Sequence, residues 1–348
     1  MDIFYSEAHH AHRGSQEFFR GQLVPCFETP ERADYVLTAM RARDLGPIHA
    51  PRSFPLERLA RVHSPRYLRF LEQAWAEWTA LGHTGDILPS VWPIRSFRSD
   101  VEPENFMARL GLYSYDSGTP FTSGTWKAAR AGADLALSAA AHLSGGARAA
   151  FSLSRPPGPH PGADFQGGYC FLNNAALAAQ ALLDDGARRV AILDVDYHHG
   201  NGTQSLFYDR ADVLFLSLHG DPKTEYPFFL GHADETGSGA GVGFNQNYPL
   251  PAGASNDVWF AALTAALERV GAYRPDALVV SLGVDTFAGD PIARFHLRSP
   301  EYQRLGRDLA ALHLPTLFVF EGGYAVAEIG ENVADVLGAF DGRKAAGR

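Results

Sequence analysis

Short apolar runs alternate with longer segments of helical periodicity along most of the chain. The runs have the length of buried strands, and the segments between them repeat apolar residues at helical spacing. Strands that alternate with helices in this way form a mainly parallel sheet with crossover helices, so the pattern predicts an α/β fold. The predicted strands are residues 2–6, 149–153, 190–194, 213–218, 277–282 and 316–320, and the predicted helices include 30–43, 65–78, 175–183, 256–270 and 300–312.

Residues 82–122 interrupt this regular pattern. The segment contains several prolines and aromatic residues and has no clear hydrophobic period. A loop of this length is unusual inside a compact domain and is usually functional or part of an interface. Because the chain shows no linker, repeat or low-complexity stretch, we expect a single domain over residues 1–348 with a long insert loop at about 82–122.

Most of the predicted strands from residue 149 onward end in polar side chains. Arg155, Asp194, His219, Asp285 and Glu321 each end or closely follow one of these strands. The carboxyl ends of parallel strands meet at one edge of the sheet, where open α/β sheets bind their ligands. We therefore expect the functional site at this edge.

Asp196 and His198 are two residues apart directly after the strand at 190–194. In extended backbone such residues point to the same face, so a carboxylate and an imidazole can meet at one cation. Asp285 is the natural third ligand, and three protein ligands leave a fourth position open, as in catalytic zinc sites. Fe²⁺, Mn²⁺ or Co²⁺ would also accept this donor set. The alternative is a polar strand end that caps a helix, which the cost of burying such groups disfavours.

Two further residues have acid–base or hydrogen-bonding chemistry suited to this edge. His160 lies in a proline-rich loop and is a candidate general base, since its unperturbed pKa is near about 6.5. Tyr324 follows a Gly-Gly turn that could aim its hydroxyl toward a developing oxyanion. Tyr169 and Tyr226 could wall a narrow channel. The alternatives are a loop histidine without a role and tyrosines that belong to the core.

Composition narrows the class of protein. The chain has 348 residues, a formal net charge of −9 and no Lys/Arg-rich block, which argues against nucleic-acid binding. Its two cysteines suggest no disulfide framework and fit a reducing cytoplasm. No apolar stretch approaches the roughly 20 residues that a membrane span needs. We therefore expect a soluble cytoplasmic protein with neither nucleic acid nor membrane as a partner.

Taken together, the motifs resemble the zinc-dependent deacetylases of the arginase/deacetylase fold, most nearly the bacterial acetylpolyamine amidohydrolases. That fold implies a central, mainly parallel sheet of about eight strands flanked by helices. The resemblance covers nearly the whole chain and is specific through the order and number of its segments. These are residues 4–6, 24–28, 62–63, 123–126, 155–158, 167–171, 194–203, 217–222, 283–287 and 321–324.

The resemblance implies a role for individual residues. Zn²⁺ would be held by Asp196, His198 and Asp285, and Tyr324 would help to polarise the amide carbonyl. A structural K⁺ would lie near Asp194, Ser217 and the backbone of Asp196, His198 and Leu218. The substrate channel would be lined by Tyr169, Tyr226 and Ile292, and the 82–122 insert would close the channel and build a homodimer.

Two departures from the family pattern bear on activity. The family has tandem histidines where this chain reads Pro159-His160, so His160 corresponds to the second histidine, the general base and then general acid, with Asn201 as its partner. Asp194 loses the imidazole that it would orient and keeps a supporting and K⁺-binding role. Because an acid–base group contributes roughly 10²–10⁴ in rate, activity is expected to be weaker or retuned.

The second departure concerns the acidic residues that polyamine members use for a distant ammonium group. These positions fall at Met107 and Gly118, although Glu102, Glu104 and Asp116 are close in sequence. The predicted function is hydrolysis of small acetylated amines such as acetylpolyamines. The alternatives are hydrolysis of less cationic small amides, and a catalytically impaired metal-binding relative.

Overall fold

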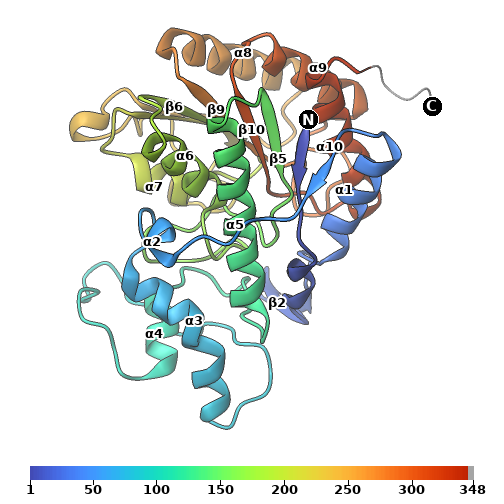
Figure 1. The fold of residues 1–348 in the computed structure, drawn as a ribbon. Coiled ribbons are helices and arrows are strands. Elements are labelled where there is room, and N and C mark those ends of the chain that lie inside the picture. Colours follow the sequence, from blue (N-terminus) through green and yellow to red (C-terminus); the bar gives the residue numbers. More distant parts are fainter. Residues whose placement is uncertain (344–348) are drawn as a thin grey trace.

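Eight parallel strands form the centre of the molecule (Figure 1). The structure is a computed structural model and describes residues 1–343. Neighbouring strands follow the order β4-β1-β5-β10-β9-β6-β7-β8, which confirms the predicted mainly parallel sheet. The strands are β1 (Asp2–Phe4), β4 (Ile48–His49), β5 (Ala149–Ser152), β6 (Val190–Asp194), β7 (Val213–Gly220), β8 (Asn245–Leu250), β9 (Ala277–Leu282) and β10 (Thr316–Phe320).

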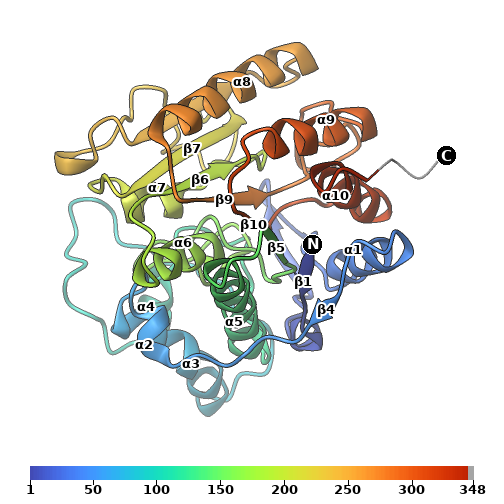
Figure 2. The ribbon, with the colours of Figure 1, turned by 45° about the horizontal axis from the view of Figure 1, so that its top comes forward.

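Helices cover both faces of the sheet (Figure 2). The helices α1, α8, α9 and α10 pack on one face, and α3, α5, α6 and α7 on the other. In the described part of the chain, none of the helices is both long and apolar enough to cross a membrane. The helices are α1 (Glu31–Ala42), α2 (Leu56–Leu59), α3 (Pro65–Ala80), α4 (Phe106–Leu112), α5 (Thr125–Ser144), α6 (Asn174–Asp184), α7 (Asn201–Phe207), α8 (Asn256–Tyr273), α9 (Ser299–Ala310) and α10 (Val326–Phe340), with short 3₁₀ turns η1 (Glu7–Ala11) and η2 (Gly239–Gly241).

Coverage of both faces explains why the central strands are continuous apolar runs. In β6, Ala191 and Leu193 point into the core beneath α8, whereas Val190 and Ile192 point into the core beneath α6. A strand buried on both faces has no polar side to alternate with its apolar side. Its first polar residue, Asp194, comes where the strand reaches the carboxyl edge.

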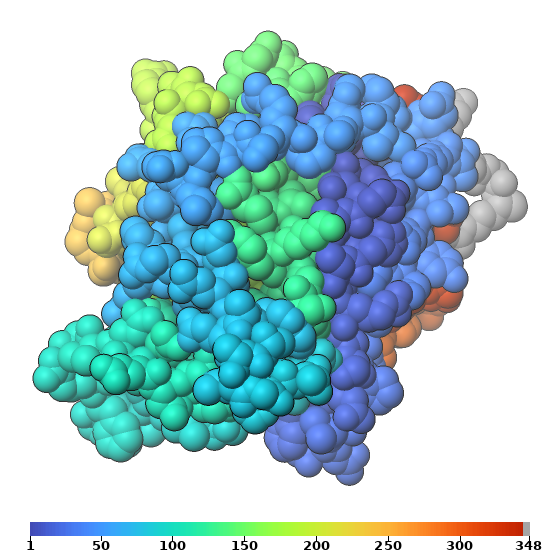
Figure 3. All heavy atoms as spheres, turned by 60° about the horizontal axis from the view of Figure 1, so that its bottom comes forward, coloured from blue at the N-terminus to red at the C-terminus, as the bar shows by residue number. Residues whose placement is uncertain are grey.

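Several elements were absent from the sequence prediction. The β2 (Gln16–Phe19) and β3 (Gln22–Pro25) strands form a separate antiparallel hairpin. The insert is not a simple loop, because residues 106–112 form α4 and the segment's ends are joined through the main chains of Ile87 and Phe121. The α4 helix is only about two turns long and buries Phe106 and Leu110. A helix this short does not show a clear hydrophobic periodicity in the sequence. Figure 3 shows the insert (teal) gathered beside α3 at one corner of the molecule.

Candidate active site

The polar strand ends do meet at the carboxyl edge of the sheet. Asp196 and His198 follow β6, and Asp285 follows β9, the neighbouring strand. One ligand atom from each of the three lies within 4.8 Å of the others. His198 Nδ1 is 2.9 Å from Asp285 Oδ2 and 3.5 Å from Asp196 Oδ1.

Backbone amides fix the two carboxylates in this arrangement. Asp196 Oδ2 accepts a hydrogen bond from Gly322 N (2.8 Å), and Asp285 Oδ1 accepts one from Tyr197 N (2.8 Å). A Cβ atom on Gly322 would lie 2.5 Å from Asp196 Oδ2 and 2.6 Å from Asp285 Oδ2. The glycine is therefore needed so that the backbone can approach both carboxylates.

The buried acidic side chains at this edge of the sheet favour the binding of a cation. Asp194, Asp196, Asp285 and Glu321 are all buried, and among the described residues Asp194 Oδ2 and Glu321 Oε1 have no hydrogen-bond partner. Burial and the charge of Asp196 raise the pKa of Asp285 to about 8. Burial opposes charge on His198, yet the two aspartates raise its pKa to about 10. Since buried carboxylates are costly unless they are paired or bind a metal, the Asp-His-Asp donor set fits a divalent cation.

Asp194 lies one strand away from Ser217 in the sheet. The two residues are register partners on β6 and β7, and Asp194 Oδ1 accepts a hydrogen bond from Asp196 N (3.1 Å). Burial and the charge of Asp196 raise the pKa of Asp194 well above its usual value. Ser217 Oγ is 2.8 Å from His219 Nδ1, and Leu218 is fully buried beside it.

His160 lies in the loop after β5, and its ring borders the cavity next to His198. Its Nδ1 atom is 2.7 Å from Asn201 Oδ1, the partner expected from the sequence. Burial lowers the pKa of His160, and the hydrogen bond to Asn201 acts in the opposite direction. A largely neutral imidazole is the form that can accept a proton.

Tyr324 follows β10 and borders the same cavity. Its backbone N–H donates to Asp290 Oδ2 (2.7 Å), and its ring lies against the Arg32 guanidinium, 4.8 Å from the ring centroid. Arg32 also donates to the carbonyls of Gly323 (2.6 Å) and Glu321 (2.5 Å), so it holds the whole turn.

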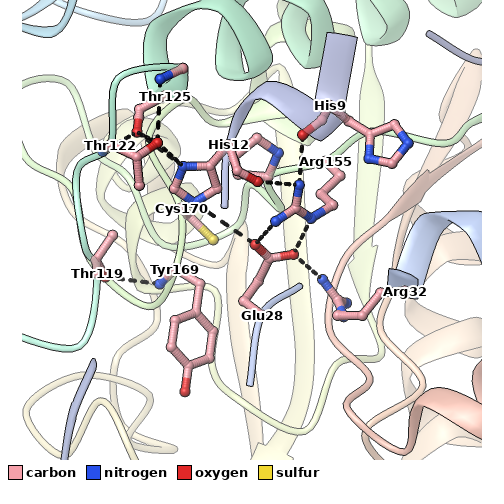
Figure 4. Close-up of polar contacts among 12 residues, drawn as sticks. His9, His12, Glu28, Arg32, Thr119, Thr122, Thr125, Arg155, Tyr169 and Cys170 are labelled. Atoms are coloured by element: carbon pink, nitrogen blue, oxygen red, sulfur yellow. Dashed lines mark hydrogen bonds and ion pairs between the residues drawn. The ribbon is translucent and has the colours of Figure 1, made fainter. Parts of the chain in front are cut away.

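A buried ion network anchors Arg32 in turn (Figure 4). Glu28 Oε1 accepts hydrogen bonds from Arg32 Nη1 (2.7 Å) and Arg155 Nε (2.8 Å), and Glu28 Oε2 accepts one from Arg155 Nη2 (2.9 Å). Arg155 also donates to the backbone carbonyls of His9 and His12. The network therefore ties the N-terminal segment to the loop after β5 and to the turn that carries Tyr324.

A cavity of about 660 Å³ opens onto the site. His160, His198 and Tyr324 lie in its wall together with the three residues expected along a channel, Tyr169, Tyr226 and Ile292. The other lining residues are Glu17, Phe18, Phe19, Arg20, Trp92, Tyr115, Asp116, Ser117, Gly118, Gly168, Thr224, Glu225, Pro227, Phe228, Phe229 and Arg294.

The positions considered for recognition of the substrate's ammonium group lie in different parts of the structure. Gly118 and Asp116 border the cavity, whereas Met107 packs against the core beneath α3 and is not among the lining residues. Glu102 and Glu104 are exposed and also lie outside this lining. The Asp116 carboxylate already accepts hydrogen bonds from the backbone of Gly118 and Gly168 and from side-chain hydroxyls.

Among the cavity residues that sequence reasoning missed, Glu17 and Tyr115 have polar side chains that contact site residues. Glu17 on β2 is 1% exposed and accepts hydrogen bonds from the Tyr169 hydroxyl (2.7 Å) and Phe27 N (3.1 Å). Burial raises the pKa of Glu17 to about 7. Tyr115, from the insert, reaches Asn201. The sequence signal for Glu17 was weak, because Glu17 stands beside Gln16 in a short strand with no clear apolar alternation.

Comparison with known proteins identifies the family. The model of the histone deacetylase domain matches residues 26–340. Acetylpolyamine amidohydrolase 2 of Pseudomonas aeruginosa is 58% identical, over 98% of this chain and 99% of that protein, and the acetylpolyamine amidohydrolase of Mycoplana ramosa is 48% identical, over 97% and 98%. A crystal structure of acetylpolyamine aminohydrolase from Burkholderia pseudomallei superimposes with a TM-score of 0.93 at 38% identity, covering 98% of both chains. The chain therefore belongs to the histone deacetylase family of metal-dependent deacetylases and amidohydrolases, together with the bacterial acetylpolyamine amidohydrolases.

Proposed function

We propose that this enzyme hydrolyses the amide bond of small acetylated amines, with acetylpolyamines as the main substrate class. The observation that carries the proposal is the convergence of an Asp-His-Asp donor set, a neutral imidazole and a tyrosine on one cavity. The named activity of the similar proteins supports the same substrate class. No observation favours a less cationic amide or a catalytically impaired relative.

Asp196, His198 and Asp285 would hold one divalent cation, with Zn²⁺ as the first choice and Fe²⁺, Mn²⁺ or Co²⁺ as substitutes. Such a cation polarises the acyl carbonyl and lowers the pKa of a water. A structural K⁺ near Asp194, Ser217 and the backbone of Asp196, His198 and Leu218 is part of the same proposal, and the register pairing of Asp194 with Ser217 supports it.

Side chains of the protein would transfer the protons and stabilise the developing charge. His160 Nε2 takes a proton from the water as its oxygen attacks the carbonyl carbon. Tyr324 donates a hydrogen bond to the carbonyl oxygen as negative charge develops there. The protonated His160 then gives that proton to the amine nitrogen as the carbon–nitrogen bond breaks, which releases acetate and the free amine.

The cavity wall has a charge pattern that suits a cationic amine. Glu17 and Glu225 are buried in its wall, whereas Arg20 and Arg294 are exposed. Buried carboxylates in the wall of the cavity would favour a substrate that carries an ammonium group away from its amide.

The insert would form a homodimer. Val91, Trp92, Ile94, Phe97 and Val101 expose apolar surface there, with Phe97 64% exposed. Clustered exposed apolar side chains mark interaction surfaces. Trp92 also borders the cavity, so a second copy at this surface would lie beside the channel mouth. A cytoplasmic location, which the two free cysteines favour, completes the proposal.

The test is turnover of a panel of acetylated amines, with metal content measured on the same sample. Wild-type protein should release acetate, and His160→Ala and Tyr324→Phe should each lower kcat/KM by roughly 10²–10⁴. Tyr35→Phe, at a half-exposed position on α1, is the matched control and should have no effect. An inactive wild type with a full metal complement, or unchanged His160 and Tyr324 variants, would refute the assignment.

A further inference from the structure

The insert reaches the candidate general base through a chain of side-chain hydrogen bonds. The Tyr115 hydroxyl donates to Asn201 Oδ1 (3.3 Å), the same oxygen that lies 2.7 Å from His160 Nδ1. On its other side, Tyr115 Oη accepts a hydrogen bond from the Tyr226 hydroxyl (2.6 Å), whose single hydrogen is shared with Asp116 Oδ2 (2.6 Å), so the Tyr115 hydrogen is left for Asn201. Polar side chains thus connect Asp116 of the insert to the imidazole of His160.

Packing holds the Tyr115 ring in place at the centre of this chain. The ring stacks on that of Tyr226, with centroids 6.0 Å apart, and meets Phe165 edge-on at 5.7 Å. A Cβ atom on Gly167 would lie 2.4 Å from the ring, so the glycine lets the backbone lie against it. The Tyr115 main chain is joined to Gln166 O by a hydrogen bond of 3.1 Å.

The orientation of the Asn201 amide decides where His160 carries its hydrogen. The amide oxygen can only accept, so an imidazole bonded to it has its hydrogen on Nδ1 and a free lone pair on Nε2. If the amide were turned by 180°, its NH₂ group would face Nδ1 and favour the other tautomer. That tautomer carries its hydrogen on Nε2 and cannot accept a proton there.

Two contacts oppose such a turn of the amide. Asn201 Nδ2 donates to the backbone carbonyl of His160 (3.3 Å), and the Tyr115 hydroxyl donates to the amide oxygen. Only the present orientation gives the amide oxygen two donors. The Tyr226 and Asp116 contacts hold the Tyr115 hydroxyl from the other side.

We propose that Tyr115 is a positioning residue, supplied by the insert, that fixes the Asn201 amide and so keeps His160 in the tautomer that accepts a proton. The proposal rests on the proposed function of His160 as general base. It gives the insert a part in catalysis beyond closing the channel. It also distinguishes Tyr115 from a residue that only walls the cavity.

The test separates kcat from KM. Tyr115→Phe keeps the ring and removes the hydroxyl, so kcat on an acetylated polyamine should fall roughly 10–100-fold, the usual effect of losing such a supporting contact. KM and metal content should stay at the wild-type values. In an Asn201→Ala background the same change should cost nothing further, because the amide that it orients is gone.

Tyr113→Phe is the matched control. It changes the same residue type two positions away, and its buried hydroxyl has no hydrogen-bond partner within residues 1–343, so kcat should stay unchanged. If Tyr115→Phe does not fold, Tyr226→Phe takes its place, with a smaller fall in kcat and the same loss of effect beside Asn201→Ala.

Specific outcomes would overturn the proposal. A raised KM with wild-type kcat would make Tyr115 a residue that only walls the cavity. An undiminished loss of kcat in the Asn201→Ala background would show that the Tyr115 hydroxyl does not act through the Asn201 amide. A wild type that turns over no acetylated amine would instead refute the proposed function.

Discussion

A buried carboxylate oxygen beside Pro159 has no hydrogen-bond partner in the described part of the chain. Asp194 Oδ2 has no hydrogen-bond partner among residues 1–343. A Cβ atom on Gly200 would lie 2.4 Å from this oxygen and 3.4 Å from Pro159 Cβ, so the proline ring and the carboxylate flank the same small space. An imidazole at position 159 could donate a hydrogen bond to Asp194 Oδ2.

Pro159→His should therefore raise turnover. The new imidazole can donate to Asp194 Oδ2 and place a second polar group beside the reacting amide, and groups of this kind contribute roughly 10²–10⁴ when optimally placed. The measurement is kcat on the acetylated polyamine panel. Pro159→Ala separates the gain of an imidazole from the loss of the ring, and equal rates in the two variants would contradict the prediction.

Glu17 should make stability depend on pH. Burial raises its pKa in the folded protein to about 7, while an unfolded glutamate titrates near about 4.3. At pH values between these two pKa values, the folded state binds more protons than the unfolded state. The free energy of unfolding therefore falls as the pH rises through this range.

Glu17→Gln removes this titration, so the variant should gain stability relative to wild type from pH 5 to pH 8. Urea unfolding at the two pH values measures the difference. If the free energies of unfolding of the two proteins differed by the same amount at both pH values, Glu17 would have an ordinary pKa in the folded protein.

Local spacing predicted part of this chemistry and tertiary folding supplied the rest. The two-residue spacing of Asp196 and His198 indicated a shared face, and the structure separates their ligand atoms by 3.5 Å. Glu17 and Tyr115 could not be found in this way. They reach the site from a small hairpin and from the insert, and no local pattern encodes where those segments pack.

At the scale of elements, one buried carboxylate connects segments that are distant in sequence. Glu28 bonds Arg32 at the start of α1 and Arg155 after β5, and Arg32 in turn holds the carbonyl groups of the turn before Tyr324. Breaking a buried ion pair leaves uncompensated charge, which costs about 3–5 kcal/mol.

Glu28→Gln should therefore lower the free energy of unfolding by about this amount and reduce kcat by loosening the Tyr324 turn. Glu31→Gln is the matched control, because Glu31 pairs with Arg13 at the surface, where such pairs contribute only about 0–1 kcal/mol. Chemical denaturation of both variants checks this. Equal losses would mean that the buried network adds no stability of its own.

Elements differed in how well the sequence predicted them. The central strands β6, β9 and β10 have the predicted bounds, because burial on both faces makes them short apolar runs. The β8 strand, Asn-Gln-Asn-Tyr-Pro-Leu, was missed because it lies at the sheet edge and is largely polar. The β2–β3 hairpin was missed because it stands outside the sheet and exposes five of its eight strand residues.

At the scale of the whole molecule, the insert should set the oligomeric state. Phe97→Asp together with Ile94→Asp places two charges on its exposed apolar surface, which no stable interface would bury unpaired. Light scattering coupled to size-exclusion chromatography should show a dimer for wild type and a monomer for the variant. As a control, Leu81→Asp changes an exposed apolar residue just before the insert and should leave the dimer intact. A monomeric wild type would contradict the prediction.

The strand order has a consequence for how the protein is made. The last strand of the sheet in sequence, β10, lies between β5 and β9 near the middle of the sheet, and β5 neighbours β1. Such pairing gives the fold a high contact order, which slows folding. During synthesis the sheet stays split into two incomplete halves, with open inner edges, until residues 316–320 have left the ribosome. Until then neither the turn carrying Tyr324 nor the Gly322 contact to Asp196 exists, so the nascent chain cannot be active and is most prone to aggregate late in translation.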